Sequence, residues 1–121
     1  MNIRKETDMG YYAMLMEDSL TVKDAEGLRQ MFIKDPAFFS GKQRDLEYLF
    51  SANLIGVEEL LPDGRLLLML EDTRYRREDW EKITPFAEGY LQWIGEDNTI
   101  WRDVFEDGKM KVVYPKISWK Y

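Results

Sequence analysis

The sequence predicts an α+β fold, in which a mostly antiparallel sheet of five to six strands has two to three helices packed on one face, in the order β-α-α-β-β-α-β-β-β. Three observations carry this prediction. Two segments of the first half repeat apolar residues at helical spacing, an explicit hairpin turn lies at 61–65, and three short strand-like segments follow residue 89. With 121 residues, 45% of them apolar, the chain is expected to form a single domain over 1–121.

The chain begins with a predicted strand. Residues 11–16 form an apolar run that ends at two acids, and its length favours a strand over a helix. A helix is predicted over about 22–34, because Thr21 and Asp24 resemble a capping box and Pro36 disfavours helical geometry just before it. Its apolar stripe is Val22, Ala25, Leu28, Met31 and Phe32.

A second helix is predicted after a clearer capping box, formed by Ser40 and Gln43. Residues at three- and four-residue spacing give this helix an apolar stripe. The stripe consists of Leu46, Leu49, Phe50 and Leu54. We expect both stripes to face the core.

The strongest local signal is a hairpin. An extended segment over 55–61 leads into Pro62-Asp63-Gly64, which supplies a fixed φ, a side-chain-to-backbone hydrogen bond and a positive φ in turn. The returning segment, Leu66–Leu70, is apolar at every position. Such a strand is covered on both faces, so we expect it to be the central strand of the sheet.

The second half predicts one short helix and three strands. The helix starts near Arg76 and stops before Pro85. The strands are Tyr90–Ile94, Thr99–Phe105 and Lys109–Tyr114, separated by turns. Beyond Pro115, Ile117, Trp119 and Tyr121 alternate as in a kinked edge strand.

Two missing residue types limit the chemistry. The chain has no Cys and no His, which excludes disulfides, thiolate nucleophiles and Ser-His-Asp or Cys-His catalysis. Only oxygen ligands remain for metals, so a carboxylate and Mg²⁺-dependent enzyme is the one catalytic alternative that we keep. No phosphate-binding glycine motif occurs, and we expect no cofactor, no metal site and no catalytic residue.

The charge is −6, with a pI near 4.7, which disfavours direct binding to nucleic acid. The dipeptide Glu-Asp occurs five times, mostly where a strand end or turn is predicted. One explanation is turn chemistry, because Asp mimics a backbone turn. The other is that Glu71, Asp72, Glu96 and Asp97 gather into a negative patch that can occupy a basic groove evolved for phosphates.

Aromatic residues and a run of arginines complete the candidates. Trp101, Asp103 and Phe105 share one face of a strand and Arg102 lies on the other, so an aromatic face is either exposed for binding or packed beneath the helices. The run Arg74, Arg76 and Arg77 can clamp a carboxylate or a phosphate. We expect instead that neighbouring acids pair with it, Arg74 with Glu78 and Arg77 with Glu81.

The function predicted from these features is that of a non-catalytic, acidic protein-binding module. Its partner is expected to be a protein with a basic surface, and the predicted contacts are Glu71, Asp72, Glu96, Asp97, Trp101 and Arg102. Inhibitors and immunity factors, including phage-borne blockers of nucleases and CRISPR effectors, share this composition, which is an analogy and not a shared motif.

The alternative is a structural or regulatory subunit that pairs through the edge strand Lys109–Tyr121.

No apolar run predicts a membrane span and the first residues do not read as a secretory signal. We therefore expect a cytoplasmic monomer or homodimer that contacts neither a membrane nor nucleic acid directly.

Overall fold

The computed structural model describes residues 11–41 and 44–115. In these residues the elements follow the predicted order with one added short strand, β4. They are β1 (Tyr12–Val22), α2 (Ala25–Lys34), α3 (Leu46–Asn53), β2 (Val57–Leu60), β3 (Leu66–Leu68), β4 (Asp72–Arg74), α4 (Arg77–Glu81), β5 (Ala87–Gly95), β6 (Ile100–Glu106) and β7 (Lys109–Val113).

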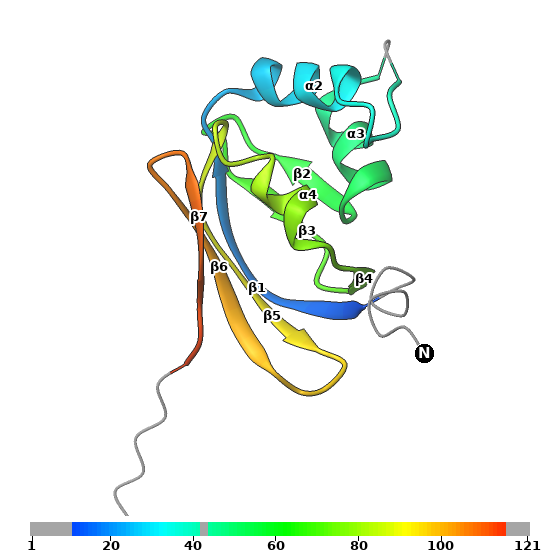
Figure 1. The fold of residues 1–121 in the computed structure, drawn as a ribbon. Helices are drawn as coiled ribbons and strands as arrows, with labels where there is room; N and C mark the ends of the chain where they lie inside the picture. Colours follow the sequence, from blue (N-terminus) through cyan, green and yellow to red (C-terminus); the bar gives the residue numbers. More distant parts are fainter. Residues whose placement is uncertain (1–10, 42–43, 116–121) are drawn as a thin grey trace, which may run out of the picture.

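A curved five-stranded sheet forms one layer of the molecule (Figure 1). Its strand order is β4-β1-β5-β6-β7 and every neighbouring pair is antiparallel. The two-stranded sheet β2-β3 and the helices lie inside the curve, on one side of the larger sheet (Figure 1). The predicted α+β fold is confirmed.

β1 pairs with both β4 and β5 and is longer than the predicted segment. A bulge falls between Leu15, which pairs with Trp93, and Glu17, which pairs with Gln92. The acids after Met16 therefore continue the strand, with Glu17 exposed, where the sequence suggested its end. A bulge bends a strand and increases its twist, which accounts for the curvature of β1 in Figure 1.

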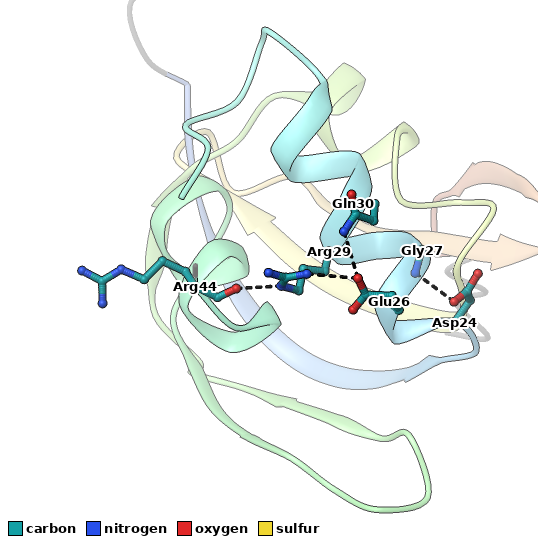
Figure 2. Close-up of polar contacts among 6 residues, drawn as sticks. All are labelled: Asp24, Glu26, Gly27, Arg29, Gln30 and Arg44. Carbon is teal, nitrogen blue, oxygen red and sulfur yellow. Dashed lines mark hydrogen bonds and ion pairs between the residues drawn. The ribbon is translucent and has the colours of Figure 1, made fainter. Parts of the chain in front are cut away.

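Asp24, and not Thr21, is the N-cap of α2. Its side chain accepts a hydrogen bond from the Gly27 N–H at 2.9 Å (Figure 2). Within α2, Arg29 and Gln30 both donate to the carboxylate of Glu26, at 3.0 and 2.9 Å. Arg29 Nε also donates to the Arg44 carbonyl at 2.7 Å, and so links the helix to the segment that leads into α3 (Figure 2).

The start of α3 also differs from the prediction. Asp45 caps it by accepting the Tyr48 N–H at 2.9 Å, so the helix begins after the Ser40–Gln43 box, of which Gln43 lies outside the described residues. An Asp directly before the apolar stripe competes well with a Ser further upstream. The predicted apolar stripe is confirmed as buried, namely Leu46, Leu49, Phe50 and Leu54.

The hairpin turn is confirmed, but the role of its second strand is not. Gly64 has φ +96°, and the Leu61 N–H donates to the Arg65 carbonyl at 2.9 Å. The prediction that Leu66–Leu70 is the central strand is wrong, because β3 pairs with β2 outside the main sheet, where β5 is central. Only Leu66 and Leu68 are buried, and Leu70 is 59% exposed. A segment that is apolar at every position does not indicate, from the sequence alone, which other elements will cover its two faces.

The core is continuous and rich in aromatic rings. Ring contacts with centroids 5.1–6.3 Å apart join α2 to the far end of the sheet, through Phe38, Phe32, Phe50, Trp80, Trp93, Tyr75, Trp101 and Tyr11. Trp101, Asp103 and Phe105 all face this core. Of the two alternatives for the aromatic face of β6, the structure shows the one packed beneath the other elements.

The three strands after residue 89 are confirmed, and β7 is an edge of the sheet as predicted. The continuation of that edge through Ile117, Trp119 and Tyr121 lies outside the described residues. Over the described part of the chain, no helix is long and apolar enough to cross a membrane.

Candidate functional site

The outer face of the sheet, on the side away from the helices (Figure 1), carries apolar side chains across several strands, as their exposed fractions show. In the strand register Met14 lies opposite Ile94, which lies opposite Ile100. Tyr12 and Met14 are 48% and 42% exposed. An apolar row of this kind on a solvent-facing sheet is typical of a surface that a partner covers.

Two separate depressions border β1, one on the outer face of the sheet and one between β1 and the β2–β3 hairpin, and they share no lining residue. The first has a volume of about 360 Å³ and is lined by Tyr12, Met14, Asp72, Ile94, Gly95, Glu96 and Asn98. The second has a volume of about 500 Å³ and is lined by Met16, Glu17, Asp18, Glu58, Leu67, Leu68 and Leu70. We call the two together the β1 groove.

The β1 groove combines exposed apolar groups with carboxylates. Its apolar members include Met16, 43% exposed, and Leu70, 59% exposed. Its acids are Glu17, Asp18, Glu58, Asp72 and Glu96. Among the described residues that line it there is no Lys or Arg. The groove therefore has the chemistry to receive a segment that is both apolar and basic.

Only two of the four predicted acids lie in the groove. Asp72 and Glu96 line it, from β4 and from the turn after β5. The Glu71 side chain instead accepts the Gly56 N–H at 3.2 Å, and Asp97 accepts the Thr99 N–H and the Tyr11 hydroxyl, both at 3.1 Å. Glu71 and Asp97 therefore stabilise the local backbone, whereas Asp72 and Glu96 line the groove.

The remaining two predicted contacts, Trp101 and Arg102, are on opposite faces of β6. Trp101 faces the core and is 6% exposed. Arg102 is on the outer face, where Nε donates to Gln92 at 2.8 Å and the guanidinium lies 4.2 Å from the centre of the Tyr90 ring. Arg102 also pairs with Glu17 at 3.6 Å, at the border of the β1 groove.

Sequence reasoning did not select the apolar members of the groove. The signal was present, because Met14 and Met16 alternate with Ala13 and Leu15, so the strand is apolar on both faces. Only Ala13 and Leu15 are buried. An apolar strand whose second face stays open indicates a surface for a partner.

Asp18 is the groove's structural acid. It accepts the Leu20 N–H at 3.1 Å and the Leu68 N–H at 2.8 Å, and so ties the β2–β3 hairpin to β1. Burial raises the pKa of this carboxyl, and the two amide donors act in the opposite direction.

A second carboxyl, Asp103, is fully buried beneath the aromatic rings. It accepts the Tyr75 hydroxyl at 2.7 Å. Its Oδ1 and the indole N–H of Trp93 are buried without a hydrogen bond of normal geometry to any described group. Burial raises the pKa of Asp103 to about 6, although the hydroxyl of Tyr75, the N–H groups of Trp93 and Trp101 and the positive charge of Arg77 stabilise its charged form.

The described residues contain no group of three or more Asp or Glu side chains arranged to hold a metal ion. Comparison of the chain with known protein families, curated proteins and solved structures found no match.

Proposed function

We propose that this protein is a binding module that takes up a basic, amphipathic segment of another protein in the β1 groove. The observation that carries the proposal is the lining of the groove, which combines exposed Tyr12, Met14, Met16 and Leu70 with carboxylates and contains no described cation. Burying the apolar side chains supplies affinity, and the carboxylates select a basic partner and speed its approach.

The chemistry of the groove favours one class of partner. A protein that binds phosphate backbones presents lysines and arginines beside apolar groups, and an acidic surface of matching shape can cover them. In this role the module acts as an inhibitor that occupies the nucleic-acid-binding site of its partner. The net charge of −6 favours such an encounter over any direct contact with nucleic acid.

The proposal is tested with a peptide of alternating lysine and leucine as the probe, immobilised for measurements of association kinetics. The variant Asp72→Lys with Glu96→Lys reverses two groove charges while leaving the groove's apolar side chains in place. We expect association to slow by about tenfold or more at low salt, and the difference to shrink as salt is added.

The matched control is Glu81→Lys with Glu106→Lys, which changes the net charge equally at exposed positions outside the groove. The groove variant must lose far more than the control. Equal losses would show that net charge alone attracts the peptide, and no binding by the unaltered protein would remove the proposal.

A second candidate is pairing through β7, which the fold favours because β7 is an edge strand of the sheet and has β6 as its neighbour on one side only. Such pairing predicts a dimer that light scattering detects and that salt barely weakens. A monomer over the accessible concentration range would exclude pairing between two copies.

A further inference from the structure

A separate cavity of about 460 Å³ lies at the inner side of the sheet, between the start of α4 and the turn joining β5 and β6. Three of its lining rings belong to the aromatic chain of the core. Trp101 lies 6.3 Å from Tyr11 and 5.2 Å from Tyr75, measured between ring centroids, and Tyr114 adds a further exposed ring to the lining.

Arg77 brings a cation to this cavity, and its charge also acts on the buried carboxyl of Asp103, whose pKa it lowers. The predicted pair between Arg77 and Glu81 is wrong, because none of the described carboxylates lies within ion-pair distance of Arg77. Its neighbour Arg76 is satisfied locally, by Glu78 at 3.2 Å and Asp79 at 3.8 Å. A guanidinium that forms no close ion pair with a described carboxylate, and that lies beside aromatic rings, is suited to bind an anionic group.

Asp97 brings an oriented carboxylate to the same cavity from another element. The Thr99 N–H and the Tyr11 hydroxyl hold its Oδ1. The bond from the Thr99 N–H lowers the pKa of Asp97, while burial and then Asp97 itself raise the pKa of Tyr11 to about 12. At neutral pH the carboxylate is charged, the hydroxyl keeps its proton, and the carboxylate can accept N–H groups from a ligand.

We propose that this cavity binds a nucleoside monophosphate, with the base stacked on Tyr11, Trp101 and Tyr114, the phosphate on Arg77 and the N–H edge of the base on Asp97. Stacking on aromatic rings suits the planar base, and a guanidinium matches phosphate geometry. A cavity of about 460 Å³ falls in the range of small-molecule sites. Guanine fits best, because its N1–H and N2–H groups can donate to Oδ2 of Asp97 while Oδ1 keeps the Thr99 N–H and the Tyr11 hydroxyl. This site is independent of the β1 groove.

The test is calorimetric titration of the full chain with GMP, guanosine and inorganic phosphate. We expect GMP to bind about tenfold or more tightly than either of the other two, because it alone uses both ends of the cavity. Arg77→Gln is expected to weaken GMP by about tenfold and to leave guanosine unchanged. Asp97→Asn keeps an oxygen for the Thr99 N–H and is expected to weaken both GMP and guanosine.

Arg65→Gln, at the exposed tip of the β2–β3 hairpin, is the control and should change neither affinity. Absence of GMP binding up to about 5 mM, or binding that Arg77→Gln and Arg65→Gln affect equally, would overturn the proposal. Binding of phosphate as tight as that of GMP would also overturn it, because the aromatic wall would then contribute nothing.

Discussion

Asp103 is a buried carboxyl, and burial makes its charged form unfavourable. It has no exposed surface, and its pKa of about 6 compares with 3.8 for an ordinary aspartate. The folded state therefore binds the proton more tightly than the unfolded state does. The stabilising contribution of this proton is fully present below about pH 4 and is lost as the pH rises through about 6.

We predict that Asp103→Asn removes this pH dependence, because an amide cannot ionise while its oxygen still accepts the Tyr75 hydroxyl. Between pH 4 and pH 7.5 the unaltered protein should lose about 2.5 kcal/mol of unfolding free energy relative to the variant. Urea unfolding at both pH values measures this difference, in which the contributions of other acids cancel. A difference that stays constant with pH would contradict the assignment.

Gly89 and Gly108 test backbone geometry as a matched pair. Gly89 has φ +118°, and a Cβ there would lie 1.8 Å from the Ser19 carbonyl oxygen. Gly108 has φ +74° with open space around it. Gly89→Ala should lower the unfolding free energy by more than about 3 kcal/mol or prevent folding, and Gly108→Ala by about 1 to 2 kcal/mol. Similar melting temperatures for the two variants would be inconsistent with the close approach of the Ser19 carbonyl of β1 to Gly89 of β5.

At the scale of elements, the attachment of the β2–β3 hairpin to the sheet depends on few groups. Besides the bridge between Thr21 and Arg65, and the hydrogen bond from the Val22 N–H to the Gly64 carbonyl at 2.7 Å, Asp18 accepts the Leu68 N–H. Since the second depression of the β1 groove lies between β1 and this hairpin, the attachment also sets the width of that depression.

We predict that Asp18→Ala destabilises the fold by about 1 to 3 kcal/mol, because the Leu68 amide loses its acceptor. Glu58→Ala, at an exposed position of the same groove, should change the unfolding free energy by less than about 0.5 kcal/mol. Chemical denaturation of both variants checks the prediction. Equal effects would mean that Asp18 does not hold the hairpin.

The elements themselves were predictable, and their arrangement was not. The stripe of α3 and the turn at Gly64 are local patterns, and the structure confirms them. The α2 stripe is confirmed only in part, because Leu28 and Phe32 are buried, whereas Ala25 is exposed and Val22 belongs to β1. The central strand was misassigned because the pairing that makes β5 central joins residues far apart in the sequence, such as Leu15 of β1 and Trp93 of β5. Local periodicity contains no information about such a distant partner, nor about the bulge that extends β1.

On the scale of the whole molecule, the candidate site was only partly visible in the sequence. The acids Asp72 and Glu96 were selected, and both line the groove. Their neighbours Glu71 and Asp97 have the same sequence pattern but are engaged by backbone amides. Which acid faces a partner depends on strand register and turn geometry, and only the folded chain shows these.

The proposed function is tested most directly by mapping where a basic amphipathic probe binds. The measurement is the change in backbone amide chemical shifts of the isotope-labelled protein on titration with the alternating lysine–leucine peptide. The account predicts that the largest changes fall on 12–18, on Asp72 and on 94–96. Changes centred on α2 and α3, or no change at saturating peptide, would contradict it.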